Sequence, residues 1–158
     1  RDLVRSRGLG DVYKRQGLGK TYLSACIAME VAARGYEVRY YPAQALIDRF
    51  ERVRFNREAG ADDLTAMREI LSCDLLILDD LGAEFATAYS QSVLYQVIND
   101  RMTEGRATII STNLDLPALS KAYNERILSR LIGSYTMLGF VGRDIRQQKL
   151  ARRREGNA

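Results

Sequence analysis

The stretch that decides the fold is Gly17-Leu18-Gly19-Lys20-Thr21. It matches the second half of the pattern Gly-x-x-x-x-Gly-Lys-Ser/Thr, in which backbone N–H groups cradle phosphates, the lysine contacts the outer phosphates and the hydroxyl contacts Mg²⁺. The first half differs, because Lys14 stands where the leading glycine belongs. The motif therefore predicts a nucleoside triphosphate as the ligand, and its altered front predicts that this chain binds ATP poorly.

Helices and strands are expected to alternate downstream of this motif. Leu23, Ile27 and Val31 recur every four residues, which is the spacing of one helix face. The expected helices run over residues 21–34, from 42 through 50, through 67–71, over 89–102, from a cap at 115, and over 125–132. The expected strands cover residues 36–41, 75–78, 107–111 and 135–140. This order predicts an α/β fold in which helices flank an open parallel sheet.

The first sixteen residues do not fit this order. A P-loop normally follows a buried strand, yet residues 1–16 contain no apolar run of strand length, and residues 3–16 are similar to a translated adapter sequence. We therefore expect the strand before the loop to be missing or poorly formed, and the native sequence to begin near Gly17. The expected organisation is a non-native-looking segment at 1–16, an ATPase domain at 17–149 and a charged tail at 150–158.

Composition narrows the classes of protein. The chain has 158 residues, 46% of them apolar and 28% charged, as is usual for one soluble globular domain. It contains no histidine, which excludes histidine-dependent triads and histidine metal sites. Two cysteines, Cys26 and Cys73, favour a reducing compartment. Without a signal peptide or an apolar run near the roughly 18 residues of a membrane span, the chain is expected to be cytoplasmic, with no membrane partner.

A second motif follows the apolar run 75–78, where Asp79 and Asp80 stand side by side. A buried parallel strand delivers such carboxylates to its carboxyl edge, where Asp79 would reach Mg²⁺ and Asp80 would polarise an attacking water. Taken alone, the pair is more typical of a turn after a core strand. Together with the loop at 17–21, the metal and catalytic roles are favoured.

Two further elements have the residue types that phosphoryl transfer uses. Asn113 follows the expected strand 107–111 and would emerge at the same sheet edge, able to orient a water, although an asparagine that only turns the chain fits as well. Arg126 and Arg130 are four residues apart on one helix face, and either could act as an arginine finger on a transferring phosphoryl group. A surface helix with two arginines is the alternative.

Several blocks carry a more specific resemblance. They are residues 55–57, 71–82, 108–114, 125–133 and 142–149. With the loop and the Asp79-Asp80 pair, they resemble the AAA+ ATPases, and among these the DnaC/DnaI helicase loaders and the IstB-like ATP-binding proteins. The resemblance extends from residue 17 to about residue 149.

The resemblance implies an AAA+ P-loop fold that uses ATP and Mg²⁺. The implied nucleotide-binding residues are Gly17, Leu18, Gly19, Lys20, Thr21, Tyr22 and Arg146. The implied metal ligands are Thr21 and Asp79, and the implied catalytic residues are Asp80, Asn113 as sensor 1, Arg130 as first candidate for the arginine finger and Arg126 as second. It also implies that the strand preceding the loop lies between the strands that end at Asp79 and Asn113, so that its loss leaves both without a partner.

The implied partners are a replicative DNA helicase, bound through a domain upstream of these residues, single-stranded DNA, and further copies of the chain that receive the arginine finger in trans. The segment 54–57 combines arginines with Phe55 and is the candidate for contacting the DNA strand, while a core position for Phe55 is the alternative. Two rival functions stay open. One is an IstB-type transposition helper on duplex DNA, and the other is a non-catalytic module that binds DNA or a partner.

Overall fold

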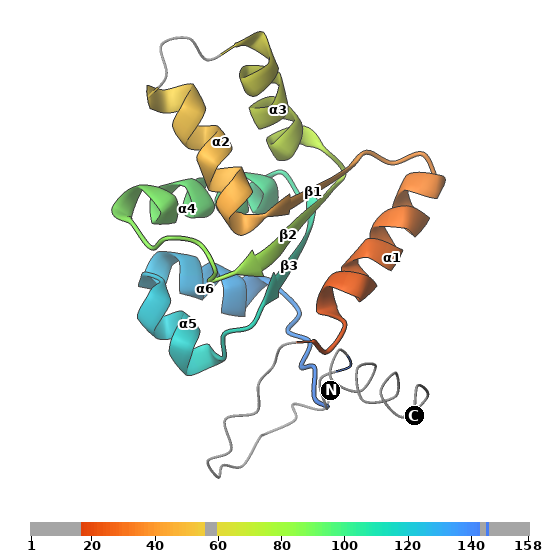
Figure 1. The fold of residues 1–158 in the computed structure, drawn as a ribbon, viewed down its shortest axis with the longest axis vertical. Helices are drawn as coiled ribbons and strands as arrows, with labels where there is room; N and C mark the ends of the chain where they lie inside the picture. The colour runs from red at the N-terminus through yellow and green to blue at the C-terminus, as the bar shows by residue number, and fades with distance from the viewer. Residues whose placement is uncertain (1–16, 56–59, 143–144, 146–158) are drawn as a thin grey trace, which may run out of the picture.

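Three parallel strands form the sheet at the centre of the molecule (Figure 1). The structure is a computed structural model and describes residues 17–55, 60–142 and 145. The strands are β1 (Val38–Pro42), β2 (Leu75–Leu81) and β3 (Ala107–Thr112), in the order β1-β2-β3. Because β2 has a strand on each side and helices on both faces, its apolar run is buried almost throughout.

Helices cover both faces of this sheet (Figure 1). On one face lies α1 (Lys20–Ala33), which contacts all three strands. On the other face lie α2 (Ala43–Phe55), α3 (Ala61–Ser72) and α4 (Ala88–Thr103). Two further helices, α5 (Leu116–Ala122) and α6 (Glu125–Ser134), follow β3, and α6 packs against α4. The order of elements therefore confirms the α/β fold with an open parallel sheet.

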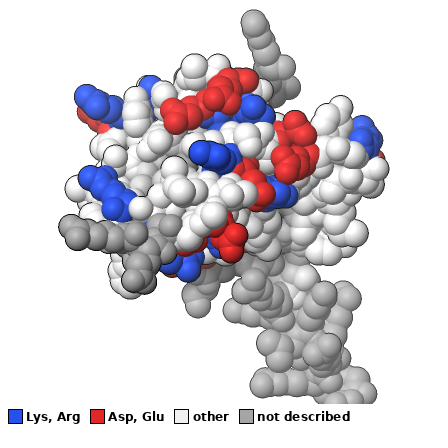
Figure 2. Space-filling view, turned by 90° about the horizontal axis from the view of Figure 1, so that it is seen from above, with Lys and Arg blue, Asp and Glu red and all other residues white. Residues whose placement is uncertain are grey.

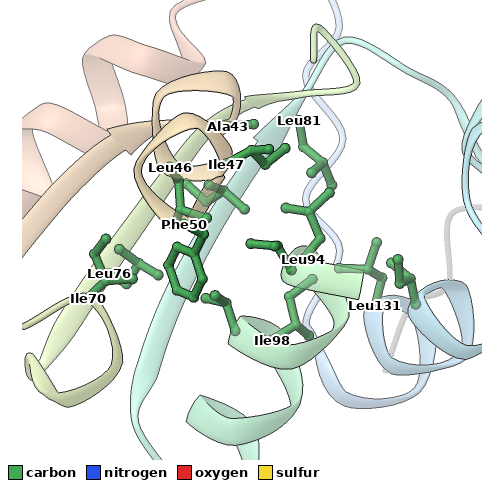
Figure 3. Packing of buried hydrophobic residues seen from close by; sticks show 14 of the residues in the cluster. Ala43, Leu46, Ile47, Phe50, Ile70, Leu76, Leu81, Leu94, Ile98 and Leu131 are labelled. Atoms are coloured by element: carbon green, nitrogen blue, oxygen red, sulfur yellow. The ribbon is translucent and has the colours of Figure 1, made fainter. Parts of the chain in front are cut away.

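The core lies between the sheet and the helices α2, α3, α4 and α6 (Figure 3). Phe50, Leu76, Leu94, Ile98 and Leu131 come from four different elements, and each is at most 5% exposed. Burying apolar side chains of this kind stabilises a fold by about 1.5–3 kcal/mol each. This cluster therefore holds α2 and α4 rigidly against β2, and the carboxyl ends of the strands are fixed with them.

Helices α4, α5 and α6 each begin after a residue whose side chain caps the first turn. Thr87 accepts a hydrogen bond from the Ser90 backbone N–H and the Ser90 hydroxyl accepts one from the Thr87 N–H, which forms a reciprocal cap on α4. Asp115 caps α5 by accepting from the Ala118 N–H, as the sequence predicted. Asn124 caps α6 in the same way. These contacts satisfy backbone N–H groups in the first turns of α4, α5 and α6.

Two expectations need correction. Residues 135–140 are not a strand: they do not pair with β1 or β3, the edge strands of the described sheet, and Met137 and Leu138 stay exposed instead of being buried by pairing. The strands that end at Asp79 and Asn113 pair directly with each other, so no strand lies between them. The helix expected over residues 21–34 is confirmed as α1, in which Leu23 is 42% and Ile27 is 36% exposed. Residues 1–16, where the strand before the loop was expected to be missing or poorly formed, lie outside the described residues.

Two other expectations from composition concern cysteine and membranes. Cys26 is exposed and Cys73 is buried, and both are free thiols. Among the helices of the described ranges, none combines the length and the apolar character that crossing a bilayer requires.

A buried arginine joins the amino ends of the strands to α3. Arg101 of α4 is fully buried, and its guanidinium donates to the carbonyl oxygens of Ile70, Cys73 and Ala107 at 2.9, 3.0 and 2.6 Å. Its Nε donates to the Thr108 hydroxyl. Since these carbonyls include the carboxyl end of α3, the helix dipole adds to the attraction for the cation. Arg101 continues the stripe of Val93 and Val97 at a spacing of four, which was the available sequence signal.

We predict that Arg101→Met lowers the free energy of unfolding by about 3 kcal/mol or more, because several buried carbonyl groups lose their donor. Urea denaturation followed by circular dichroism measures this change. Arg34→Met is the matched control, since Arg34 makes an exposed ion pair with Glu30, and it should change stability by no more than about 0.5 kcal/mol. Equal effects of the two substitutions would contradict a structural role for Arg101.

Candidate nucleotide site

The loop before α1 contains two glycines in a left-handed backbone conformation. Gly17 and Gly19 have φ values of 71° and 90°, in the left-handed region that disfavours other residues. Helix α1 begins directly after Gly19, whose carbonyl accepts from the Leu23 N–H at 2.9 Å. The first turn of α1 contains no acidic residue. Its N-terminal N–H groups and positive dipole end therefore suit an anion such as a phosphate.

A β-bulge brings both aspartates to one edge of the sheet. Leu78 pairs with Ile110 and Leu81 pairs with Thr112, so that Asp79 and Asp80 together oppose a single residue, Ser111. Asp80 takes a left-handed conformation with φ of 58°. Without the bulge the two side chains would point to opposite faces of the sheet. With it, Asp79 faces α1, Asp80 stays exposed at the strand end, and Leu81 returns to the core at 1% exposure.

Three hydroxyl groups from three elements converge on the Asp79 carboxylate. The Thr21 hydroxyl of α1 donates to Oδ2 at 3.0 Å, the Tyr40 hydroxyl of β1 donates to Oδ2, and the Ser111 hydroxyl of β3 donates to Oδ1. Burial acts to raise the pKa of Asp79, but the hydrogen bonds from Ser111, Tyr40 and Thr21 outweigh it and lower the pKa below its usual value. Asp79 is therefore ionised at neutral pH.

Tyr40 is the site residue that sequence reasoning missed. It pairs in register with Ile77, two residues before Asp79, and its long side chain reaches diagonally across the sheet face to the carboxylate. Burial, together with the hydrogen bond to Asp79 and the negative charges of Asp79 and Asp80, raises the pKa of Tyr40 to about 12. The phenol thus keeps its proton at neutral pH. The only signal in the sequence was a polar side chain near the end of a strand.

A second chain of hydrogen bonds joins the loop to Asp80. The Lys20 Nζ donates to Oδ1 of Asn113 at 2.7 Å, and Nδ2 of Asn113 donates to Oδ1 of Asp80 at 2.7 Å. Asn113 therefore lies between the lysine of the first motif and the second aspartate of the other. The structure brings together Lys20, Thr21, Asp79, Asp80 and Asn113, which come from segments up to 93 residues apart.

These donors fit Mg²⁺ bound together with a nucleotide. A hydroxyl and a carboxylate adjoin at the end of a helix that attracts anions, and both are the hard oxygen ligands that Mg²⁺ prefers. In the described part of the chain, no group of three or more histidine, cysteine or acidic side chains could hold a metal by itself. Mg²⁺ that binds with a nucleotide takes one or two protein oxygens and completes its shell with phosphates and water.

The remaining predicted nucleotide-binding residues, Leu18, Tyr22 and Arg146, differ in their surroundings. Leu18 lies next to Gly142, and the Ile145 N–H donates to the Gly17 carbonyl at 3.0 Å. Gly142 and Ile145 therefore lie against the loop. Tyr22 is 75% exposed on the first turn of α1. Arg146 lies outside the described residues.

The two arginines of α6 differ in their surroundings. The Arg130 guanidinium donates twice to Oδ1 of Asn99, at 2.9 and 2.7 Å, and lies 4.4 Å from the ring centroid of Tyr95. These contacts hold Arg130 against α4. Arg126, one turn earlier, is exposed. The geometry thus leaves Arg126 better able to reach a neighbouring molecule.

A cluster of aromatic and basic side chains lies away from this edge, at the end of α2. Phe55 is 69% exposed, so the alternative of a core position for it is wrong. Its ring meets that of Tyr89 edge to face at 5.4 Å, and the Arg54 guanidinium lies over both rings. An open hollow of about 610 Å³, lined by Asp48, Glu51, Arg52 and Phe55, adjoins it. Asn56 and Arg57 lie outside the described residues.

Charge alone does not mark a binding face on the side seen in Figure 2. Basic and acidic side chains are interspersed there. Arg49, for example, lies 3.6 Å from Asp63. The aromatic cluster is therefore a more specific indication of a ligand than the net charge of the chain.

Comparison with known proteins agrees with this geometry. The family model of the IstB-like ATP binding protein matches residues 13–149. The replicative helicase loader DnaC of Escherichia coli (strain K12) is 26% identical over 121 residues, which cover 74% of this chain and 47% of DnaC. The chain thus spans about half the length of this relative.

Two solved structures have a similar fold. The crystal structure of the DnaC helicase loader superposes with a TM-score of 0.70 at 22% identity, covering 80% of this chain and 74% of that chain. The replication initiator DnaA bound to AMPPCP and single-stranded DNA superposes with a TM-score of 0.63 at 25% identity, covering 77% and 36%. Both likenesses confirm the expected AAA+ fold.

The matched residues include the loop, both aspartates, Asn113 and the helix that carries Arg126 and Arg130. The match extends over most of the chain and ends at residue 149, where the resemblance in the sequence also ends. The chain therefore belongs to the family of IstB-like ATP-binding proteins.

Proposed function

We propose that this chain is the ATP-hydrolysing module of a helicase-loader-type protein, which couples the bound nucleotide to contacts with single-stranded DNA and a replicative helicase. The observation that carries the proposal is the contact of the Thr21 hydroxyl with the Asp79 carboxylate at 3.0 Å. It joins the two motifs that a Mg²⁺-dependent nucleotide site needs. The likeness to DnaC supports the loader class.

Each residue then has a defined task. Lys20 and the N-terminus of α1 bind the phosphates, while Thr21 and Asp79 hold the cation. Asp80 accepts a proton from the attacking water, and Asn113 orients that water between Lys20 and Asp80. When bound, Mg·ATP supplies a phosphoryl group whose charge the metal neutralises in part.

Completing the loop motif is expected to increase ATP binding. Lys14→Gly restores the leading glycine, which lets the backbone approach a phosphate. We predict about tenfold tighter ATP binding, equal to about 1.4 kcal/mol, measured by titration with a fluorescent ATP analogue. Hydrolysis should become measurable in the same variant.

The matched control adds Lys20→Ala or Asp79→Asn to that variant. Each should reduce hydrolysis on the order of 100-fold, since each removes charge stabilisation at the phosphates or the cation. Hydrolysis that survives both substitutions would disprove the catalytic assignment. Binding without turnover in the Lys14→Gly chain would instead favour the rival of a non-catalytic binding module.

The exposed arginine of α6 is our first candidate for a finger that acts on a neighbouring copy. Arg126→Ala should lower hydrolysis on the order of 10³-fold with little change in stability. Arg130→Ala should lower the free energy of unfolding by about 1–2 kcal/mol, because the contacts with Asn99 and Tyr95 are lost. Mixing Arg126→Ala with Asp79→Asn subunits should restore activity if the finger acts in trans. A mixture as inactive as its parts would contradict that geometry.

Single-stranded DNA is the proposed ligand of the cluster formed by Arg54, Phe55 and Tyr89. Exposed rings give bases a stacking surface, and the arginine adds charge for the backbone. The similar fold of a DnaA structure that contains single-stranded DNA supports this proposal. The proposed DNA-binding surface thus adds Tyr89 of α4 to the segment 54–57 expected from the sequence.

Phe55→Ala is expected to weaken binding of an oligothymidine by about 1–3 kcal/mol, which is about 5- to 150-fold, as measured by fluorescence anisotropy. Phe85→Ala is the matched control, because Phe85 is 81% exposed and lies in the loop between β2 and α4. An equal loss in both variants would indicate a nonspecific aromatic effect and would count against the cluster.

The name of the matching family favours a second candidate, an IstB-type transposition helper that shares the ATPase core but meets a transposase on duplex DNA. A transposase gene beside this one would support it against the loader. Helicase binding, oligomerisation and a cytoplasmic location stay predictions. Since the chain spans about half of DnaC, helicase binding is best tested with the complete protein.

A further inference from the structure

Tyr40 of β1 combines an exposed ring with a hydroxyl directed at a buried carboxylate. The residue is 41% exposed, so its ring contributes little to the core. Asp79, which accepts the hydrogen bond, is only 8% exposed. Since little water reaches that carboxylate, a donor lost there is not readily replaced. The contact that explains a tyrosine at this position is therefore the one made by its hydroxyl.

The hydroxyl donors around Asp79 are distributed over both of its carboxylate oxygens. An ionised carboxylate offers about four lone-pair sites. Oδ2 accepts from Tyr40 and, at 3.0 Å, from Thr21, while Oδ1 accepts from Ser111 and is 3.3 Å from the Thr21 hydroxyl. Because the Thr21 hydroxyl has one proton and lies nearer Oδ2, Tyr40 and Thr21 share Oδ2 while Ser111 holds Oδ1. Tyr40 and Ser111 hold the two ends of the carboxylate and prevent its rotation.

We propose that Tyr40 is a positioning residue of the nucleotide site, whose hydroxyl fixes the Asp79 carboxylate so that Asp79 and Thr21 present their oxygens to the Mg²⁺ of Mg·ATP together. The proposal rests on the proposed function of this site. It assigns to β1, a strand that carries none of the recognised motifs, a direct part in cation affinity. Donors of this kind outside the metal ligands commonly change metal affinity by about 10- to 100-fold when they are removed.

The test is Tyr40→Phe, which removes one hydroxyl and keeps the exposed ring. A non-hydrolysable fluorescent ATP analogue is bound to the full chain, and to the full chain carrying Lys14→Gly, while Mg²⁺ is titrated. We expect the half-saturating Mg²⁺ concentration to rise about tenfold, while binding in EDTA stays unchanged. If Tyr40 acted only in folding, its substitution would weaken binding of the analogue in EDTA as well as in Mg²⁺. Tyr36→Phe is the matched control, since Tyr36 is 56% exposed just before the same strand.

Two further variants check that the effect comes from the lost hydroxyl and acts through Asp79. Tyr40→Leu, which also loses the hydroxyl, should give a similar shift even if its stability changes. In the presence of Asp79→Asn, Tyr40→Phe should have no further effect, because the proposed route runs through that carboxylate.

The outcomes are separable. If the parent chains bind the analogue in a Mg²⁺-dependent way and Tyr40→Phe requires no more Mg²⁺ than they do, the role of Tyr40 is disproved and the proposed function stands. If neither parent chain shows Mg²⁺-dependent binding, the proposed function fails, and the role of Tyr40 fails with it.

Discussion

The arrangement of the nucleotide site depends on the pairing of β2 with a strand on each side. That pairing places the end of β2 between Tyr40 of β1 and Ser111 of β3, and the bulge opposite Ser111 turns both aspartates toward the same edge. Because the core packs against the opposite face of β2, the strand cannot slide or rotate without exposing apolar side chains. The position of the Asp79 carboxylate is therefore as rigid as the core itself.

The two ends of the sheet are stabilised by different chemistry. At the amino end, Arg101 is fully buried and satisfies carbonyl groups of α3, β3 and the segment that leads into β2. At the carboxyl end, hydroxyl groups satisfy a nearly buried anion. A cation among carbonyls and a carboxylate among hydroxyls each replace the water that burial removes. The amino end thus anchors the strands, and the carboxyl end remains open to a ligand.

Helix α2 connects this edge to the aromatic cluster. It begins with Ala43, directly after the β1 residue that pairs with Asp79, and ends at Phe55. Its 13 residues give it a length of about 20 Å. Ala43, Leu46, Ile47 and Phe50 of α2 are buried against the core. Helix α2 thus spans the distance between the end of β1 at the nucleotide site and the proposed DNA-binding surface.

The sequence by itself determined the class of fold and predicted which polar side chains lie together at the carboxyl edge of the sheet. The loop motif, the apolar run before Asp79 and Asp80 and the position of Asn113 after a strand are local patterns, and parallel strands bring their carboxyl ends to one edge in any such sheet. The tertiary structure decided what depends on partners far away in the chain. Residues 135–140 look like a strand but do not pair with either edge strand, and Asn99 and Tyr95 hold the side chain of Arg130 against α4. Tyr40 joined the site only through its register with β2, and Arg101 entered the core only because carbonyls from three segments meet there. Hydrogen-bond partners separated by tens of residues leave no local pattern, so only the packed sheet reveals them.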